Sequence, residues 1–286
     1  MHAELQPHQA DPDKKLKLGL MVTLSENVSA AFEKVVSVGL ETCQMQCWEP
    51  QILTPDLAKL VLQAQDRTGV RVSTFWAGSS GATVWNFKEG PTTIGLVPPA
   101  TRAGRIEELK RGADFASNLG VTTITTHVGF IPENPSDDAY PPLVDAIRQV
   151  ARHCADAGLG FDFETGQETP VTLLRTIDAV GTGNLGVNLD PANLILYGKA
   201  NPVDALEVLG PYVRGVHAKD GLYPTDGDSL GRETPLGEGL VDFPVLIGQL
   251  KSRFHYGNPI TIEREIEGDQ QIADIRRAIE LLDPLL

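Results

Sequence analysis

Short apolar runs alternate with longer amphipathic segments along the whole chain. The apolar runs are rich in Val, Ile, Leu, Phe and Thr and are nearly continuous, as is typical of parallel strands that are covered on both faces. A segment whose apolar residues have helical spacing follows each run. The pattern predicts eight strands, at residues 16–21, 42–48, 70–76, 121–128, 159–164, 185–190, 213–217 and 259–263.

Helix starts are marked at three points between the predicted strands. Thr54, Thr169 and Asn201 each stand immediately before a proline. Thr and Asn side chains favour the N-cap position of a helix, and proline favours the first helical position. These pairs therefore predict helices that begin at residues 55, 170 and 202.

Eight strand–helix units predict the α/β class and, within it, a single-domain (β/α)8 TIM barrel. The 286 residues suit this fold, which typically takes about 250. We expect residues 16–286 to form the barrel and residues 1–15 to form a flexible N-terminal tail. A doubly wound open sheet is the alternative, but it usually carries a glycine-rich phosphate loop after its first strand. Residues 22–27 follow the first predicted strand and contain no glycine.

Composition narrows the class of protein and its location. The net charge of -14 argues against nucleic acid as a partner, because binding to phosphates requires a basic surface. No run approaches the ~18 apolar residues of a membrane helix, and residues 1–15 lack the apolar block of a signal peptide. Cys43, Cys47 and Cys154 show no paired spacing, which is typical of a reducing compartment. We therefore expect a cytoplasmic protein without membrane partners.

Four predicted strands end in a residue that can bind a metal ion. Glu164, Asp190, His217 and Glu263 are the last residues of the fifth to eighth strands, and strand alternation directs their side chains into the barrel. Three carboxylates in one barrel mouth would repel each other unless a cation lay among them. We therefore predict one divalent metal ion. Three carboxylates and an imidazole suit Mn²⁺, Mg²⁺, Co²⁺ or Fe²⁺, and Zn²⁺ is an alternative.

Two further features surround this predicted metal site. The long loops at residues 77–100 and 221–242 both follow strands, so we expect them on the barrel face where active sites form. Asp162 and Asn188 precede two of the ligands by two residues and should point inward one layer deeper. We expect them to orient Glu164 and Asp190 or to fill the barrel with polar contacts.

The four strand ends lie within longer motifs that have a known counterpart. These are residues 163–168 (FETGQE), 188–193 (NLDPAN), 216–220 (VHAKD), 235–239 (PLGEG) and 262–265 (IERE). Together they resemble the sugar isomerase/epimerase family of xylose-isomerase-like TIM barrels, which also includes sugar phosphate isomerases. The motifs cover the fifth to eighth strands, and the first half of the chain is similar to the family in its strand–helix rhythm and in His127.

The resemblance implies an activity and a role for each ligand. Relatives of this type bind one metal through a Glu, an Asp, a His and a Glu at these four strand ends, and the ketose epimerases among them use the first and last Glu as the acid/base pair. The resemblance carries these roles to Glu164, Asp190, His217 and Glu263, with Glu164 and Glu263 as the pair. It therefore implies a metal-dependent isomerase or epimerase of keto-sugars or sugar phosphates, which transfers protons through a metal-stabilised enediolate. A small sugar or polyol would be the substrate, and members of the family are often dimers or tetramers.

Six further residues are candidates for substrate binding. Lys219 lies two residues beyond His217 and could hold a substrate oxygen or pair with Asp220. The resemblance implies substrate contacts for Arg232, in the loop after the seventh strand, and for a polar residue at the position of Asn193. The others follow or end earlier strands and could line the pocket, with structural packing as the alternative: His127, Trp76 and Glu49.

Three other functions compete with this prediction. A metal-dependent dehydratase acting on an inosose-like polyol ketone starts with the same proton abstraction and then loses hydroxide. A barrel that binds a sugar or a metal without catalysis is the second. An abasic-site endonuclease is the third, but that class needs a three-metal cluster with more histidines than His127 and His217 provide at the strand ends.

Overall fold

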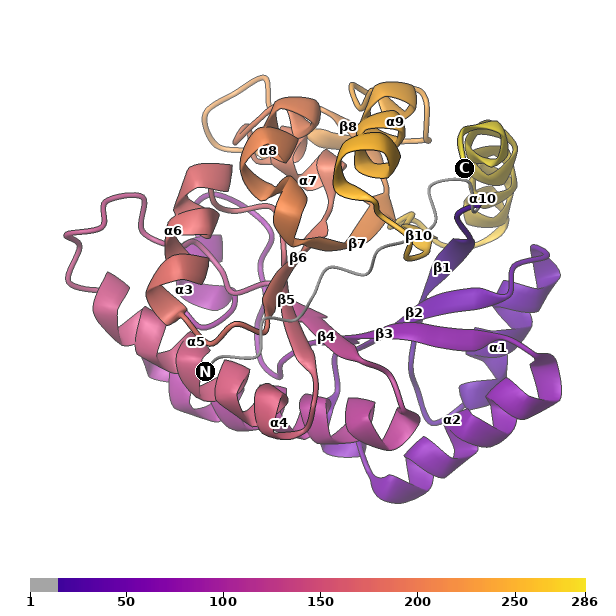
Figure 1. Cartoon of the computed structure of the whole chain (residues 1–286), viewed down its shortest axis with the longest axis horizontal. Coiled ribbons are helices and arrows are strands. Elements are labelled where there is room, and N and C mark those ends of the chain that lie inside the picture. Colours follow the sequence, from indigo (N-terminus) through magenta and orange to yellow (C-terminus); the bar gives the residue numbers. More distant parts are fainter. Residues whose placement is uncertain (1–14) are drawn as a thin grey trace.

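The computed structural model describes residues 15–286, and its eight main strands form a closed parallel barrel (Figure 1). This confirms the predicted TIM barrel. Residues 1–14, most of the predicted tail, lie outside the described residues, so the proposed domain boundary stays a prediction. Around the barrel the strands follow the order β1-β10-β7-β6-β5-β4-β3-β2. Their bounds are β1 Leu18–Thr23, β2 Thr42–Cys47, β3 Arg71–Ala77, β4 Thr123–Thr126, β5 Gly160–Glu164, β6 Leu185–Leu189, β7 Val213–Ala218 and β10 Ile260–Ile262.

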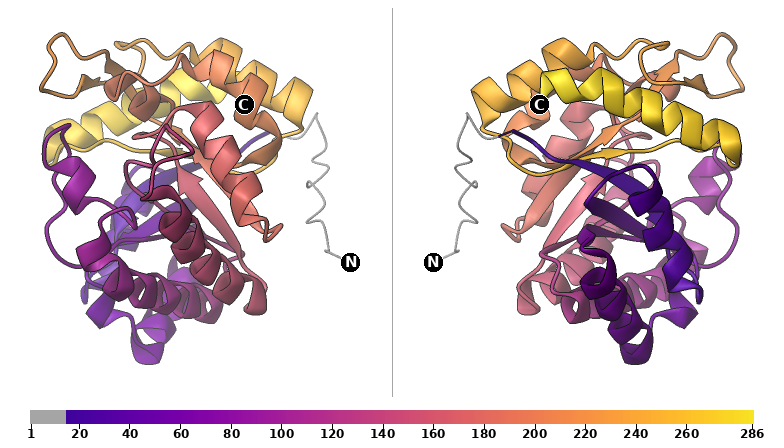
Figure 2. Two further views of the ribbon diagram at one scale, coloured as in Figure 1. Left: turned by 90° about the vertical axis from the view of Figure 1, so that its left-hand side faces the viewer. Right: turned by 90° about the vertical axis from the view of Figure 1, so that its right-hand side faces the viewer.

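Helices surround the barrel on its outside (Figure 2). The long ones are α1 Val28–Ser37, α2 Pro55–Thr68, α4 Pro99–Leu119, α5 Tyr140–Asp156, α6 Pro170–Val180, α8 Pro202–Leu209, α9 Phe243–Phe254 and α10 Asp269–Leu282. Two short helices, α3 Gly90–Thr93 and α7 Pro191–Leu196, lie in the loops after β3 and β6. Within residues 15–286, no helix combines the length and apolar character needed to cross a membrane.

The three predicted helix starts are confirmed, and each cap is formed by a side chain. The hydroxyl of Thr54 accepts the backbone N–H of Leu57 at 3.2 Å, and α2 begins at the proline between them. Thr169 caps α6 and Asn201 caps α8 in the same way. Each cap satisfies backbone N–H groups that lack a partner within the helix.

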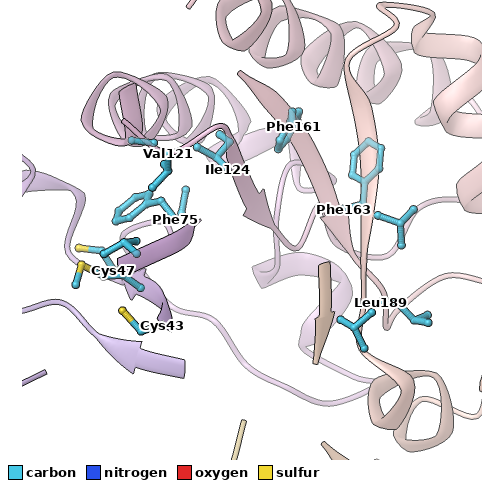
Figure 3. Close-up of a cluster of buried hydrophobic side chains, with 14 of the residues drawn as sticks. Cys43, Cys47, Phe75, Val121, Ile124, Phe161, Phe163 and Leu189 are labelled. Carbon is cyan, nitrogen blue, oxygen red and sulfur yellow. The ribbon is translucent and has the colours of Figure 1, made fainter. Parts of the chain in front are cut away.

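The hydrophobic core lies between the barrel and the helices (Figure 3). Phe161 and Phe163 of β5 are both fully buried, because alternate residues of the strand face the helices. Their ring centroids lie 5.5 Å apart. Cys43 and Cys47 of β2 are free and buried beside this core, so they pack as small apolar side chains.

The interior of the barrel holds a buried polar layer beneath the strand ends. Asp162 of β5 and Asn188 of β6 belong to it. Glycines on neighbouring strands leave the space that these side chains occupy. A Cβ at Gly186 would stand 2.3 Å from Asp162 Oδ1, and one at Gly215 would stand 2.2 Å from Asn188 Oδ1. Any side chain at either glycine would therefore displace the polar layer.

Of the two roles expected for Asp162 and Asn188, the structure shows polar contacts inside the barrel and no contact that orients Glu164 or Asp190. Asp162 lies 3.5 Å from Arg214, and Asn188 lies 3.0 Å from His217. Neither makes a hydrogen bond to the carboxylate two residues further along its own strand. The reason is geometric, since residues i and i+2 stand about 6.6 Å apart along a strand, while side chains from neighbouring strands meet at closer range.

The two long loops contain structure that the sequence pattern did not predict. The second loop includes a small antiparallel sheet of β8 Asp220–Leu222 and β9 Arg232–Thr234. Strands of three residues are too short to show a periodicity in the sequence. Lys88 of the first loop pairs with Asp228 of the second at 3.2 Å. The two loops therefore touch each other.

The buried carboxyl group of Asp162 predicts a pH-dependent stability. Burial raises the pKa of Asp162 to about 7, although Arg214 acts in the opposite direction. An unfolded aspartate titrates near a pKa of about 4. Between these values the folded chain keeps a proton that the unfolded chain has released, so wild-type stability falls as the pH rises. Across this window, the free energy of unfolding of Asp162→Asn should rise relative to that of wild type by on the order of 1 kcal/mol for each unit that the pH increases.

Urea denaturation of both proteins between pH 4 and pH 8 measures this difference. Asp178→Asn is the control, because Asp178 is an exposed aspartate on α6. Its difference from wild type should stay constant over the same range. A pH-independent difference for Asp162→Asn would contradict the raised pKa.

Candidate metal centre and active site

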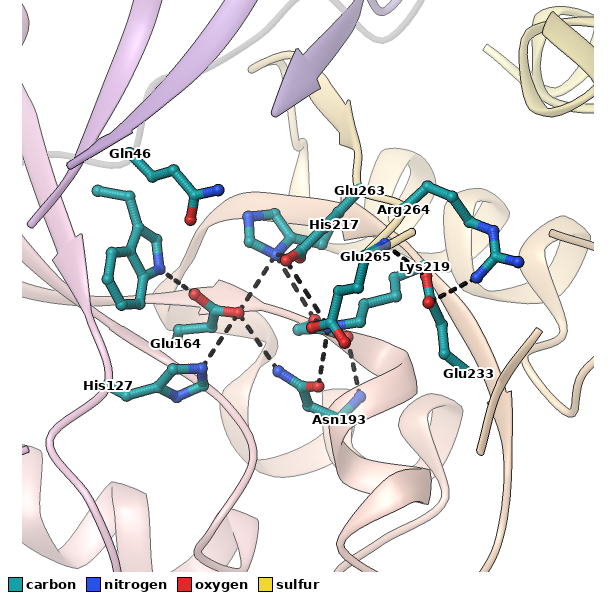
Figure 4. Close-up of polar contacts among 12 residues, drawn as sticks. Gln46, His127, Glu164, Asn193, His217, Lys219, Glu233, Glu263, Arg264 and Glu265 are labelled. Atoms are coloured by element: carbon teal, nitrogen blue, oxygen red, sulfur yellow. Dashed lines mark hydrogen bonds and ion pairs between the residues drawn. The ribbon is translucent and has the colours of Figure 1, made fainter. Parts of the chain in front are cut away.

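Glu164, Asp190, His217 and Glu263 converge at one point in the mouth of the barrel (Figure 4). Each offers one ligand atom, and these atoms all lie within 4.8 Å of one another. The convergence follows from topology, since β5, β6, β7 and β10 are consecutive in the barrel. Glu164 ends β5 and His217 lies in β7, while Asp190 and Glu263 directly follow β6 and β10.

The ligand atoms are oriented as a cation-binding group requires. His217 Nδ1 lies 2.8 Å from Glu263 Oε2, 3.4 Å from Glu164 Oε1 and 3.6 Å from Asp190 Oδ2. Among the described residues, His217 Nδ1, Asp190 Oδ2 and Glu263 Oε2 are buried and lie at ion-pair distance from charged neighbours, but they make no hydrogen bond of good geometry. Buried polar atoms normally have partners, so three unpartnered atoms facing one point fit a bound metal ion. A set of oxygen and imidazole ligands suits a divalent cation.

Three neighbours hold the carboxylate of Glu164. Trp76 Nε1 donates to Oε2, Asn193 Nδ2 donates to Oε1 at 3.3 Å, and His127 Nε2 lies 3.4 Å from Oε1. Burial alone would raise the pKa of Glu164, but the charges and hydrogen bonds of His127 and His217 hold it well below its usual range. Glu164 is therefore ionised and fixed in orientation.

Lys219 provides a buried positive charge beside the cluster. Its Nζ lies 3.5 Å from Asp190 Oδ2, 3.7 Å from Glu263 Oε1 and 2.5 Å from Glu265 Oε1, and it donates to Asn193. Burial acts to lower the pKa of Lys219, but these carboxylates raise it well above its usual value. The ammonium group therefore stays charged and offsets part of the buried negative charge.

All three tryptophans of the chain lie together beside this site. The rings of Trp48 and Trp76 have centroids 4.7 Å apart, and those of Trp48 and Trp85 are 6.0 Å apart. Trp85 also stands 5.1 Å from the ring of His127 and is 41% exposed. Trp85 comes from the first long loop. The loop thus carries an aromatic side chain to the edge of the site.

Two buried polar residues after β5 have unused hydrogen-bonding capacity. Both carboxylate oxygens of Glu168 and both amide atoms of Gln167 are buried without a geometrically sound partner in the described chain. Burial raises the pKa of Glu168 to about 7, although nearby His127 lowers it. Glu168 and Gln167 could therefore accept hydrogen bonds from a polar ligand.

The loop after β10 is tied to the second long loop by ion pairs. Arg264 pairs with Glu233 of β9 at 2.5 Å and with Asp274 of α10 at 2.8 Å. Glu233 also accepts the backbone N–H of Glu265 at 3.1 Å. These contacts fix the segment on which Glu263 stands.

Two predicted substrate-binding residues lie apart from the cluster. Glu49 is exposed and pairs with Gln51. Arg232 is exposed on β9, where alternation directs its side chain away from the face of Glu233. Their contact with a substrate stays a prediction. By contrast, His127, Trp76 and Asn193 each contact Glu164, and Lys219 lies beside Asp190 and Glu263.

Gln44 of β2 is a site residue that the sequence reasoning missed. It is buried, and its Oε1 lies against His217 Nε2 from the other side of the barrel. A signal was present, because the strand TCQMQC places polar residues at every second position between apolar ones. That alternation directs Gln44 inward.

Comparison with known proteins places the chain among similar barrels. A model of the xylose isomerase-like TIM barrel family matches residues 32–285. The crystal structure of a xylose isomerase domain protein from Planctomyces limnophilus is 34% identical, with a TM-score of 0.88, over 95% of this chain and 98% of that one.

Two more distant relatives extend the comparison. An uncharacterized protein of Escherichia coli K12, YihM, is 27% identical over 145 residues, which are 49% of this chain. The match spans only 44% of the length of YihM. The structure of a D-tagatose 3-epimerase-like protein shares the fold with a TM-score of 0.74 at 20% identity, over 94% of this chain and 97% of that one.

Asp190→Asn is expected to abolish most of the stabilisation by a divalent ion. Asp190 Oδ1 caps α7 by accepting the backbone N–H of Asn193 at 2.9 Å, and asparagine can keep this cap. The substitution removes the negative charge and replaces Oδ2, the oxygen that faces the cluster, with an amide NH2 group. An ion at 100 times its Kd stabilises a folded protein by about 2.7 kcal/mol. Mn²⁺ should therefore raise the Tm of chelator-treated wild type, and should raise that of Asp190→Asn much less.

Thermal unfolding with and without Mn²⁺ provides the measurement. Glu267→Gln is the control, because Glu267 is an exposed carboxylate outside the cluster and its loss should leave the Mn²⁺ response intact. An equal rise in Tm for wild type and Asp190→Asn would place the ion elsewhere.

Proposed function

Because the chain belongs to the xylose isomerase-like TIM barrel family, we propose that it is a divalent-metal-dependent sugar isomerase or epimerase. The observation that carries the proposal is the convergence of Glu164, Asp190, His217 and Glu263 within 4.8 Å. Its substrate would be a small keto-sugar or related polyol ketone. The ion would be Mn²⁺, Mg²⁺, Co²⁺ or Fe²⁺, with Zn²⁺ as the alternative.

The order of the strands supports a two-base mechanism. Glu164 and Glu263 come from the two ends of an arc of four strands, and Asp190 and His217 lie between them. The two glutamates therefore lie on either side of the position that a substrate bound at the cluster would occupy. One carboxylate can take a proton from a substrate carbon, and the other can return a proton to the opposite face or to the neighbouring carbon. Epimerisation and aldose–ketose isomerisation need the same pair.

The surrounding residues support proton transfer at carbon. When bound, a divalent ion supplies Lewis-acid stabilisation of charge on adjacent carbonyl and hydroxyl oxygens of a sugar. Glu164 is ionised and is held by Trp76 and Asn193, so its oxygen is aimed before a substrate arrives. Lys219 is charged and close to both Asp190 and Glu263. Its charge favours the negative enediolate of the substrate.

The chemistry of the residues beside the cluster suits the binding of a polyhydroxylated substrate. The unpartnered oxygens of Glu168 and Gln167 can accept hydrogen bonds from hydroxyl groups. Trp76 and Trp85 offer apolar faces for the C–H surface of a sugar. Pockets for small ligands combine such apolar walls with a few aimed polar groups. His127 stands between these two sets, next to Glu164.

Exchange of substrate C–H protons with deuterated water tests the proposed function. Deuterium should enter next to the carbonyl of at least one compound in a panel of free and phosphorylated ketoses and inososes, as followed by NMR. Chelation should stop the exchange and Mn²⁺ should restore it. Glu263→Gln should slow exchange by ~10²–10⁴-fold, since this is the typical contribution of a positioned acid or base.

Glu267→Gln is the matched control and should exchange at the wild-type rate, because its carboxylate is exposed and outside the cluster. Retention of the substrate's hydroxyl groups would support isomerisation or epimerisation, whereas loss of water would identify a dehydratase. Wild-type exchange by Glu263→Gln, or by the metal-free protein, would refute the mechanism.

A further inference from the structure

The imidazole of His217 is completely buried, and its two nitrogens face different surroundings. Nδ1 faces the carboxylates of Glu164, Asp190 and Glu263. Nε2 faces away from them, toward the side-chain amides of Gln44 and Asn188. The ring therefore separates the predicted ligand cluster from the polar layer beneath it.

The contact between Gln44 and His217 determines which nitrogen carries a proton. The nearest atom of Gln44 is Oε1, an amide oxygen, which has no hydrogen to donate. Two lone pairs would repel each other at hydrogen-bond range, so this contact requires a hydrogen on Nε2. A neutral imidazole with a proton on Nε2 has its free lone pair on Nδ1. Nδ1 lies 2.8 Å from Glu263 Oε2, a contact that holds a proton on Nδ1 as well. A divalent ion would take the place of that Nδ1 proton and bind the lone pair, while the proton on Nε2 stays.

We propose that Gln44 is a positioning residue that holds the Nε2 proton of His217 and thereby keeps Nδ1 available to a divalent ion. This inference rests on the proposed metal site but concerns a residue outside it. Gln44 stands on β2, which is separated from β7 by two strands in the barrel order. Its side chain therefore reaches His217 across the interior of the barrel. Partners of this kind on a metal-bound imidazole fix both its tautomer and its orientation.

A cavity beneath His217 determines how different substitutions of Gln44 would act. A polar cavity of about 60 Å³ lies there, and Gln44, Asn188, Asp162 and Arg214 are among its lining residues. A water molecule needs roughly 10–15 Å³ of such space, so this cavity has room for water. A shortened side chain at position 44 would let water reach Nε2 and accept its proton. An apolar side chain of similar size would fill the space and remove the Gln44 acceptor from Nε2–H.

Asn188 occupies the other side of the same nitrogen. Its Nδ2 is placed 3.0 Å from Nε2, and its Oδ1 stands where a Cβ at Gly215 would collide with it. Nδ2 can only donate, so a proton on Nε2 requires a half turn of the Asn188 amide, which would bring the accepting Oδ1 to that nitrogen as a second acceptor. Gln44 is the neighbour whose accepting oxygen already faces Nε2 in the structure.

The affinity for Mn²⁺ of four variants tests the proposal. Gln44→Leu should raise the Kd for Mn²⁺ by ~10–100-fold, the usual effect of losing such a partner. Gln44→Ala should have a smaller effect because water can replace the amide, and Gln44→Glu should bind nearly as well as wild type because it keeps an acceptor oxygen. Gln46→Leu is the matched control, since Gln46 lies on the same strand but bonds to Thr23 and Trp48.

A second measurement reads the ring directly in wild type. Long-range ¹H–¹⁵N NMR of the Zn²⁺-loaded protein should show His217 with a proton on Nε2 and the metal on Nδ1. Metal on Nε2, or an unchanged Kd for Gln44→Leu, would overturn the role of Gln44 while leaving the metal site in place. A wild-type protein that binds no divalent ion would overturn both this inference and the proposed function.

Discussion

Negative charge buried in the barrel mouth sets the main electrostatic constraint on this structure. Glu164 and Asp190 are almost inaccessible to solvent, and together with Glu263 they surround a single imidazole nitrogen. Burial makes each ionised carboxylate costly unless opposite charge lies close to it. The chain supplies part of that charge through Lys219 and, until an ion takes its Nδ1, through protonated His217. The carboxylates raise the pKa values of both groups well above their usual range. A divalent ion at the centre would supply the remainder.

The barrel makes this concentration of charge sterically feasible. Parallel strands bring their carboxyl ends to one rim, so four consecutive strands deliver four ligands without any long loop. Two residues further back, the same strands carry a polar layer in place of the usual branched apolar filling. Gly186 and Gly215 give this layer its space, because any side chain at either position would collide with Asp162 or Asn188. The strand glycines are thus part of the support of the site.

The same layout divides the site into two faces with different tasks. Above the ligands, loops from β3 and β7 contribute Trp85 and the segment tied down by Arg264 and Glu233. These side chains shape the space that a substrate would enter. Below the ligands, Gln44 and the polar cavity contact the reverse side of His217. His217 is the side chain that touches both faces, so changes in the lower layer can reach the upper one through a single ring.

The sequence by itself determined the eight strands, the helix caps and the four strand-end residues that converge as candidate metal ligands. These features are local, because a strand end, a Thr-Pro cap or an alternating run is encoded within a few residues. The tertiary structure alone decided which side chains meet across the barrel. Gln44 and His217 are 173 positions apart, and their contact depends on how the barrel closes rather than on either strand. The strands β8 and β9 of the second loop were not predicted for a related reason. Each has three residues, which is too short to show a periodicity, and each forms only through its pairing with the other.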